Sequence, residues 1–230
     1  MNKKITLVKF FMFAGNILVP CYAIAMCILF KRTFGGISFA LFISAMIMER
    51  AWETFKTSKE QHREEFHGDW TLAVVTFSYL FLFILTITEF YLFKQSSNIY
   101  LAALGVILLG SSFRMRFWGM AALGKQWAVH AVGAQKIRKV RIVKVGPYKY
   151  IRHPIYLGII FEELSYPLIA NANYALFFAA FVCIPLVVIR ALTEEKFSVR
   201  RFGEKYLSYK KEVGMLFPVQ LLKNNGHSSF

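Results

Sequence analysis

The sequence predicts an all-α, polytopic membrane protein: a bundle of five or six transmembrane helices with a polar face on the cytosolic side. The first observation is composition, because 57% of the 230 residues are hydrophobic and 18% are charged, whereas soluble domains carry about 25% charged residues. The second is that the apolar residues form separate runs close to the ~20 residues that cross a bilayer. The third is an excess of basic residues between the runs, as in cytosolic loops.

Six apolar runs are candidates for the transmembrane helices. The last two are separated by Asn171-Ala172-Asn173, which favours a tight turn, so they are expected to form a helical hairpin. Six spans fit this pattern, and so do five spans with a re-entrant last hairpin. The second run is short and is expected to extend through Trp52 if it spans. The runs are Phe10 to Phe30, Phe34 to Met48, Thr71 to Phe93, Ile99 to Trp118, Ile155 to Ala170 and Tyr174 to Leu192.

Basic residues are distributed unevenly around these runs. With six spans and a cytosolic N-terminus, only Lys31, Arg32 and Lys94 of the 28 Lys and Arg residues lie outside. Cytosolic loops carry such an excess, so both termini are expected to be cytosolic. The same charges favour anionic membrane lipids as partners. Because the charges flank membrane runs, the net charge of +15 does not indicate a nucleic-acid site.

The sequence predicts neither a disulfide nor a metal site. Cys21, Cys27 and Cys183 lie in apolar runs without a Cys-x-x-Cys spacing. His62 and His67 have no carboxylate or thiolate at a spacing typical of a metal site.

The segment from Gly146 to Gly158 predicts a turn followed by the start of a helix. Its Gly-Pro pair is typical of a turn, and Pro154 fits the first helical position, which places His153 at the N-cap. The free N–H groups of a helix start favour a ligand carboxylate or phosphate. A glycine one turn further on lets a ligand or another helix approach closely.

A simpler interpretation is a helix that enters the membrane with interface anchors at its start (Tyr150, Arg152 and Tyr156). A second element favours a binding site. Glu194 and Glu195 lie at the cytosolic end of the last apolar run, where a helix C-terminus prefers cations. The acidic pair therefore indicates a positive partner, either Arg190 one turn earlier or a cationic ligand.

Together these elements resemble the isoprenylcysteine carboxyl and phospholipid methyltransferases, which are membrane-embedded enzymes. The shared motifs are Gly-Pro-Tyr at 146–148, Arg-His-Pro-x-Tyr-x-Gly at 152–158 and Arg-x-x-x-Glu-Glu at 190–195. Leu-Gly-x-x-Trp at 123–127 precedes them, and Phe-Gly-Glu-x-Tyr-x-x-Tyr at 202–209 with Pro218 follows them. The resemblance covers about residues 110 to 218 and implies S-adenosylmethionine as the cofactor.

In that family the helix start and the acidic pair bind S-adenosylmethionine at the cytosolic membrane face. The chemistry agrees, because the cofactor carries a carboxylate that suits a helix N-terminus and an ammonium that suits a carboxylate. The cofactor-binding residues that the resemblance implies are Tyr148, His153, Pro154, Tyr156, Gly158, Glu194 and Glu195.

The methyl acceptor is expected to be lipophilic and to enter from the bilayer. Arg152 and His153 are the candidate catalytic residues; Arg152 either holds an acceptor carboxylate or only anchors the helix at the interface. Glu162 and Glu163 follow in the next apolar run, where a carboxylate is costly, and they are candidates for lining the path of the acceptor. A carboxylate, an amine, a phenol and a thiol acceptor all fit these motifs.

Two other functions fit part of the pattern. An NADPH-dependent membrane reductase of the sterol-reductase type has a similar Arg-His-x-x-Tyr-x-Gly run, and a non-catalytic basic membrane protein explains the charge alone. The Gly-Pro-Tyr motif and the acidic pair favour the methyltransferase. Glu89 lies deep in an apolar run and is expected to be functional or protonated, with no partner evident from the sequence.

We divide the chain accordingly. Residues 1–120 form N-terminal transmembrane helices, residues 121–218 form the cofactor-binding region with the C-terminal hairpin, and residues 219–230 form a tail.

Overall fold

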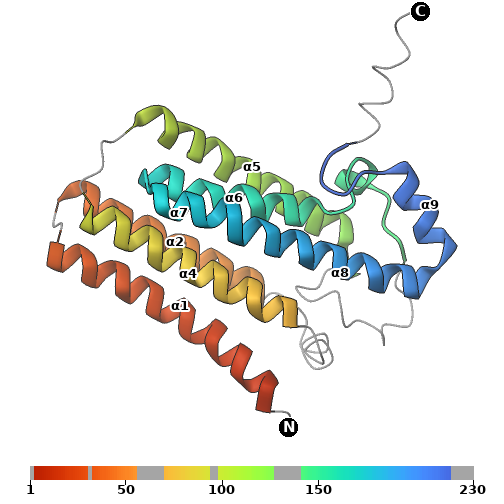
Figure 1. Cartoon of the computed structure of the whole chain (residues 1–230), viewed down its shortest axis with the longest axis horizontal. Coiled ribbons are helices and arrows are strands. Elements are labelled where there is room, and N and C mark those ends of the chain that lie inside the picture. Colours follow the sequence, from red (N-terminus) through yellow and green to blue (C-terminus); the bar gives the residue numbers. More distant parts are fainter. Residues whose placement is uncertain (1–2, 31–32, 56–69, 94–97, 127–140, 219–230) are drawn as a thin grey trace, which may run out of the picture.

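The computed structural model describes residues 3–30, 33–55, 70–93, 98–126 and 141–218. Within these ranges the chain is helical without a regular strand, and one isolated parallel bridge joins Ile151 to Gly214. The long helices lie side by side along one common direction (Figure 1). The prediction of an all-α membrane bundle is therefore confirmed.

The described helices follow one another back and forth through the bundle. The first four are α1 (Lys3–Phe30), α2 (Phe34–Phe55), α4 (Trp70–Leu92) and α5 (Ile99–Leu123), the last continued by the 3-10 turn η1 (Gly124–Gln126). A 3-10 helix, η3 (Gly146–Lys149), then leads to α6 (Pro154–Ala170). The chain returns through α7 (Asn173–Phe178), a π-helical segment η4 (Ala179–Cys183) and α8 (Ile184–Phe202), and α9 (Glu204–Glu212) follows.

Four stretches of the described chain are long and apolar enough to cross a bilayer: Phe34–Trp52, Trp70–Leu92, Ile99–Leu123 and Asn173–Phe202. A shorter apolar helix, Ala14–Phe30, accompanies them. The 17-residue α6 lies between α5 and α8 and runs along the same direction. This agrees with the expected five or six spans, and it shows the predicted hairpin as a pair of adjacent helices.

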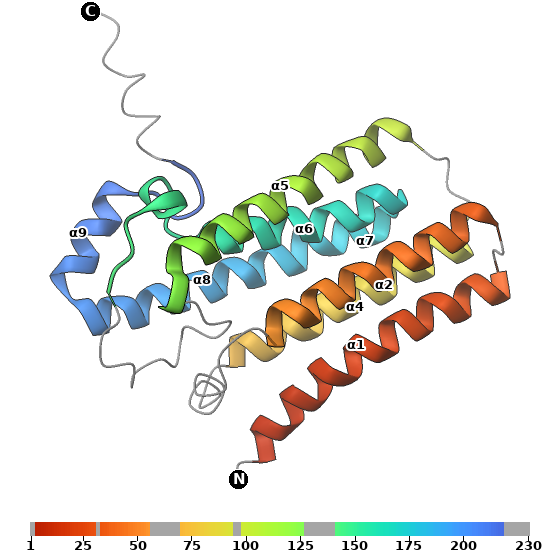
Figure 2. The ribbon, with the colours of Figure 1, turned by 180° about the vertical axis from the view of Figure 1, so that it is seen from behind.

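One end of the bundle gathers the segments for which chemistry was predicted. Figure 2 shows that the start of α1, the end of α2, the start of α4 and the end of α5 all lie at this end. The start of α6, the end of α8 and the whole of α9 lie there too. We call it the polar end. The alternation of helix direction is the one that the apolar runs predicted.

Two helices continue beyond their predicted ends, and both carry charged residues inside the bundle. The second helix runs to Phe55 and carries Glu49 and Arg50, and α5 runs to Leu123 and carries Arg116. Arg116 is fully buried. The helices extend because these side chains are paired with one another and with α6, so their charges are compensated inside the bundle.

Small residues bring α5 and α6 into close contact. A Cβ added to Gly158 would lie 2.7 Å from Cγ of Arg116, and one added to Gly119 would lie 2.8 Å from Cγ1 of Ile155. Close approach at small residues is the usual basis of helix association in membranes. The sequence left open whether Gly158 admits a ligand or a helix, and in the structure it admits α5.

Glu89, whose partner was not evident from the sequence, accepts two backbone hydrogen bonds at the start of α7. Its carboxylate oxygens lie 3.1 Å from the nitrogen of Tyr174 and 2.9 Å from that of Ala175. A carboxylate at a helix N-terminus satisfies free N–H groups and interacts favourably with the helix dipole. Glu89 thus stabilises the turn of the hairpin at the end of the bundle away from the predicted site.

Candidate active site

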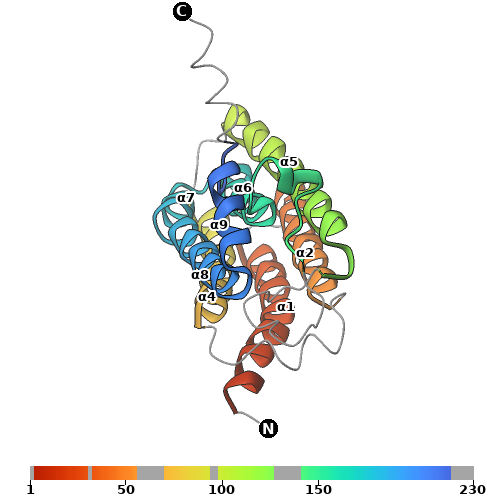
Figure 3. The ribbon, with the colours of Figure 1, turned by 90° about the vertical axis from the view of Figure 1, so that its right-hand side faces the viewer.

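The site predicted from the sequence lies at the polar end, where the start of α6 meets α8 and α9 (Figure 3). Backbone pairing fixes the residues before α6: the nitrogen of Arg152 donates to the oxygen of Gly214 at 2.9 Å, and that of His153 to the oxygen of Met215 at 3.0 Å. The hydroxyl of Tyr209 on α9 donates to the backbone oxygen of Tyr148 at 2.6 Å. The C-terminal segment therefore holds the helix start in place.

The helix itself begins as predicted. His153 is the N-cap residue, without a side-chain capping bond, and Pro154 is the first helical residue. The predicted turn before it is the 3-10 helix η3. It starts at Gly146 with φ +60°, and a Cβ there would lie 3.1 Å from the Cβ of Ala122 on α5. Another residue at this position would be strained in its backbone conformation and crowded against α5, and glycine avoids both costs.

Glu195 is the point at which three elements meet. Its carboxylate accepts from Nε of Arg152 at 2.7 Å, lies 3.3 Å from Nε2 of His153, and pairs with Nζ of Lys210 on α9 at 2.7 Å. Arg152 also donates to the backbone oxygens of Lys210, at 3.1 Å, and of Val213. Glu195 and Arg152 are both buried in this arrangement. Basic residues of the chain itself therefore already compensate the charge of Glu195.

Glu194, its neighbour, has a different environment. It is half-buried, and it is an electrostatic neighbour of Tyr148, Tyr156 and Tyr206, which come from η3, α6 and α9. Burial, with the charge of Glu194 adding to it, raises the pKa of Tyr148 well above its usual value. The pKa of Tyr206 is raised in the same direction, first by burial and then by Glu195 and Glu194. These phenols stay neutral and remain hydrogen-bond donors at physiological pH.

Aromatic and basic side chains complete the surroundings of Glu194. The rings of His153 and Tyr156 are stacked with their centroids 5.4 Å apart. Arg190, one turn before Glu194, is buried, is an electrostatic neighbour of Tyr156, and donates to Oγ1 of Thr71 on α4 at 3.1 Å. A half-buried carboxylate beside a stacked aromatic pair is chemically suited to an organic cation.

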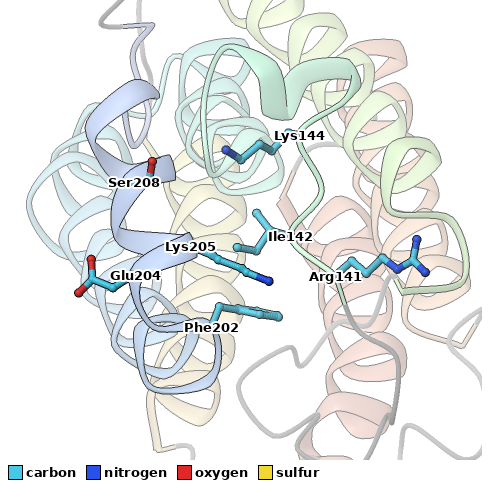
Figure 4. A pocket seen from close by; sticks show the side chains of 7 residues that line it. All are labelled: Arg141, Ile142, Lys144, Phe202, Glu204, Lys205 and Ser208. Carbon is cyan, nitrogen blue, oxygen red and sulfur yellow. The ribbon is translucent and has the colours of Figure 1, made fainter.

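A cleft opens beside this region, between α9 and the segment that leads to η3 (Figure 4). It measures about 670 Å³, a volume typical of small-molecule sites. Lys205 extends from α9 toward this segment, and Lys144 extends back toward α9. Ile142 and Phe202 pack with the buried tyrosines of α9, and no residue predicted for the site is among those that line the cleft. Its lining residues are Arg141, Ile142, Lys144, Phe202, Glu204, Lys205 and Ser208.

The structure separates the two glutamates of α6 from this site. Glu162 is fully buried and forms a network with α2, α4 and α5. Nε of Arg50 lies 2.9 Å from its Oε1 and NH2 of Arg50 lies 2.5 Å from its Oε2, while NH1 of Arg116 donates to the same Oε2. The hydroxyls of Tyr79, at 2.5 Å, and of Tyr166 donate to Oε1. The sequence did not indicate this network, because its members are spread over four helices.

The structure thus brings together seven of the residues predicted for the site: Tyr148, Arg152, His153, Pro154, Tyr156, Glu194 and Glu195. Gly158, Glu162 and Glu163 lie deeper, inside the bundle. Lys210 was missed, because nothing distinguishes it in sequence from the neighbouring lysines. The helix α8 ends at Phe202 and the chain turns at Gly203, so that Tyr206 and Tyr209 of α9 are buried against Ile142 and Val199.

Comparison with known proteins gives matches to methyltransferases. Residues 101–199 match the model of the isoprenylcysteine carboxyl methyltransferase (ICMT) family. The uncharacterized protein YpbQ of Bacillus subtilis is 29% identical over 164 residues, which are 69% of this chain and 95% of that protein. Protein-S-isoprenylcysteine O-methyltransferase of Saccharomyces cerevisiae is 28% identical over 195 residues, 79% of this chain and 80% of that enzyme.

A shorter similarity concerns a different methyl acceptor. Methanethiol S-methyltransferase 1 of Bradyrhizobium diazoefficiens is 42% identical over 71 residues, which are 31% of this chain and 24% of that enzyme. The matches agree with the resemblance that the motifs indicated. Over residues 101–199 the chain is similar to the isoprenylcysteine carboxyl methyltransferase family, and the chain is a membrane methyltransferase.

Proposed function

We propose that this methyltransferase uses S-adenosylmethionine as the methyl donor and acts on a lipophilic acceptor that reaches the polar end from the bilayer. The observation that carries the proposal is the contrast between the two adjacent glutamates. Glu195 is buried in direct contact with Arg152, His153 and Lys210. Glu194 is half-buried next to Tyr148, Tyr156 and Tyr206, with Arg190 near it through Tyr156. Glu194 is therefore the more accessible carboxylate of the two.

The residues present fit the donor. S-adenosylmethionine supplies an electrophilic methyl group on a sulfonium, and it also carries an ammonium and a carboxylate. Glu194 is complementary to the ammonium, the stacked rings of His153 and Tyr156 offer an aromatic face to a cation, and the first N–H groups of α6 suit the carboxylate. Glu195 is then a positioning residue that holds α6, α8 and α9 around the donor.

The acceptor is proposed to be lipophilic because α6 begins where the polar segment 141–153 meets apolar helices. Methyl transfer from a sulfonium needs mainly an in-line arrangement of donor and acceptor, and orientation supplies much of the rate. Arg152 was a candidate for holding an acceptor carboxylate. Its guanidinium donates hydrogen bonds to Glu195 and to the backbone oxygens of Lys210 and Val213. We therefore propose that Arg152 acts by positioning Glu195, while His153 lies next to the reacting groups.

The acceptor group is left open by this proposal. The relatives include an isoprenylcysteine O-methyltransferase and a methanethiol S-methyltransferase. The former acts on a lipid-modified acceptor and the latter on a small thiol. The apolar helices around α6 favour an acceptor with a hydrophobic tail, and a carboxylate, an amine, a phenol and a thiol remain candidates for its reacting group.

Substitution of Glu194 tests the donor assignment. Glu194→Gln is expected to weaken S-adenosylmethionine binding about tenfold or more, since a hydrogen bond to a charged group contributes about 1.5 to 3 kcal/mol. Isothermal titration calorimetry of the purified protein measures this. The matched control is Glu212→Gln, which removes a carboxylate that is 55% exposed and pairs with Lys144. Equal affinity in wild type and Glu194→Gln would contradict the assignment, and binding of NADPH in place of S-adenosylmethionine would favour the reductase alternative.

We further propose that the polar end faces the cytosol, with both termini and the site on that side and anionic lipids around its basic residues. In a Cys21→Ala background, a cysteine at Ser208 on α9 should react with an impermeant thiol reagent only after the cells are permeabilised. A cysteine at Tyr100, which is 84% exposed at the start of α5 and lies at the opposite end, should react in intact cells. The reverse pattern would show that the orientation is inverted.

A further inference from the structure

Glu163 is a fully buried glutamate for which the structure shows no hydrogen-bond partner. Both of its carboxyl oxygens lack one among the residues that the structure describes. The two other fully buried glutamates differ from it, because Glu162 accepts from arginines and tyrosines and Glu89 accepts from two backbone nitrogens. A buried polar group without a partner destabilises a protein. An ionisable residue that persists inside a membrane helix therefore indicates a function.

The surroundings of Glu163 indicate which chemistry it offers. Its electrostatic neighbours are Arg50, Glu162 and Cys183. Arg50 is paired with Glu162, and Arg116 with Glu162 and Glu49, so these arginines have their own carboxylates. A second charge beside Glu162 would be uncompensated at membrane depth, so the carboxyl group of Glu163 is neutral there. A neutral carboxyl donates one hydrogen bond and accepts others.

The helical hydrogen-bond pattern is interrupted near Glu163, both in α6 itself and in the neighbouring segment η4. Pro167 has no backbone N–H, so the helical hydrogen bond that residue 167 would donate to the backbone oxygen of Glu163 is missing. In the second arm of the helical hairpin, the π-helical segment η4 (Ala179–Cys183) precedes α8, and Pro185 is the second residue of α8. Short π-helical segments within α-helices are frequent at functional sites. Broken helices around a polar group are also the arrangement that forms binding sites at membrane depth.

The position of Glu163 relates it to the methyl-transfer site. It lies seven residues beyond Tyr156 on α6, about 10 Å along the helix axis. Because successive residues of a helix point in directions about 100° apart, Glu162 faces α2 and α5 while Glu163 lies near Cys183. The sulfur of Cys183 lies 3.8 Å from the backbone oxygen of Ser78 on α4. Glu163 is thus near the junction of α4, α6 and the π-helical segment.

We propose that Glu163 is the hydrogen-bonding group of an intramembrane binding site at this junction, which receives a hydroxyl or an amide that the acceptor carries about 10 Å from the atom that is methylated. Such groups both donate and accept, as a neutral carboxyl does. The inference rests on the proposed function in naming the occupant as the acceptor. It adds that the acceptor has a second polar group within its hydrophobic part.

Thermal unfolding in nanodiscs of one phospholipid separates a binding role from a structural one. Glu163→Leu removes a carboxyl without partners and should leave the Tm unchanged or raise it. Glu89→Leu is the matched control, since the same substitution there removes two hydrogen bonds and should lower the Tm by several degrees. A fall in Tm for Glu163→Leu as large as that for Glu89→Leu would overturn the proposal, because it would show that Glu163 is structural.

The binding role is probed with 1-dodecanol and n-dodecane at equal mole fraction in the same nanodiscs. In wild type, 1-dodecanol should raise the Tm more than n-dodecane does. This difference should be lost in Glu163→Leu and partly kept in Glu163→Gln, whose amide also donates and accepts. No difference in wild type, or a full difference in Glu163→Leu, would overturn the proposal.

Calorimetric titration of wild type and Glu163→Leu with S-adenosylmethionine distinguishes this inference from the proposed function. Equal affinities are expected, because Glu163 lies away from the donor site. If wild type fails to bind S-adenosylmethionine while the Tm results hold, the donor assignment is wrong and the Glu163 site stands. If both proteins bind the donor and the Tm results fail, only the Glu163 site is wrong.

Discussion

Glu162→Ala is expected to cause the largest loss of stability of any substitution considered for this protein. The change removes the carboxylate that Arg50 and Arg116 share inside the bundle, although Arg116 keeps its pair with Glu49. It also removes the acceptor of the Tyr79 and Tyr166 hydroxyls. Breaking a buried ion pair by removing one partner costs about 3 to 5 kcal/mol, because the remaining charge is buried and uncompensated. Denaturant unfolding in a fixed detergent, followed by circular dichroism, measures the change in the free energy of unfolding.

Ser112→Ala is the control for this substitution. Ser112 is also fully buried beside Glu162, but its hydroxyl lies 3.5 Å from the carboxylate, so its loss should cost much less. A loss below about 1 kcal/mol for Glu162→Ala would show that water or a rearranged side chain compensates the arginines.

Glu195→Ala is expected to have the largest effect on activity. It removes the carboxylate that joins Arg152 and His153 before α6 to Lys210 on α9. Without it, α9 should detach locally from the start of α6, and the residues around Glu194 should lose their positions. At about 3 kcal/mol for a broken buried pair, methyl transfer and donor binding should fall about a hundredfold.

Hydrogen–deuterium exchange distinguishes this positioning role from direct contact with the donor. Glu195→Ala should increase exchange in α9 (Glu204–Glu212) and at Arg152 and His153, whose amides pair with the C-terminal segment. Glu194→Gln serves as the control, since it should weaken donor binding and leave the exchange of α9 unchanged. Unchanged exchange in Glu195→Ala, together with lost donor binding, would place Glu195 in contact with the donor.

The positioning role depends on tyrosines that the chain keeps neutral. Burial raises the pKa of Tyr209 to about 12, an effect that nearby Arg152 partly opposes and Glu195 reinforces. The phenol therefore remains protonated at physiological pH and keeps donating to the backbone oxygen of Tyr148 at 2.6 Å. The contact between α9 and η3 is thus insensitive to pH changes in the physiological range.

The sequence by itself determined the fold class and most of the local structure of the site. Apolar length sets the number of spans, because a bilayer requires about 20 apolar residues for each. The start of α6 at Pro154 follows equally directly, because proline fits the first position of a helix and few others. The acidic pair was expected to need a cationic partner because it was placed at a helix C-terminus, where carboxylates oppose the dipole. That placement was wrong: α8 continues to Phe202, so Glu194 and Glu195 lie inside the helix. Their basic neighbours come from packing and from Arg190.

Only the tertiary structure decided how the acidic residues divide their roles. Glu194 and Glu195 are adjacent and chemically identical in sequence, and so are Glu162 and Glu163. Successive helical residues point in directions about 100° apart, so the two members of each pair meet different neighbours. Glu195 and Glu162 pair with basic residues of the chain. Glu194 is half-buried near tyrosines, and Glu163 is buried without a hydrogen-bond partner among the described residues. The partners are far away in sequence, as with Arg50 and Glu162, so the packing of the helices alone brings them together.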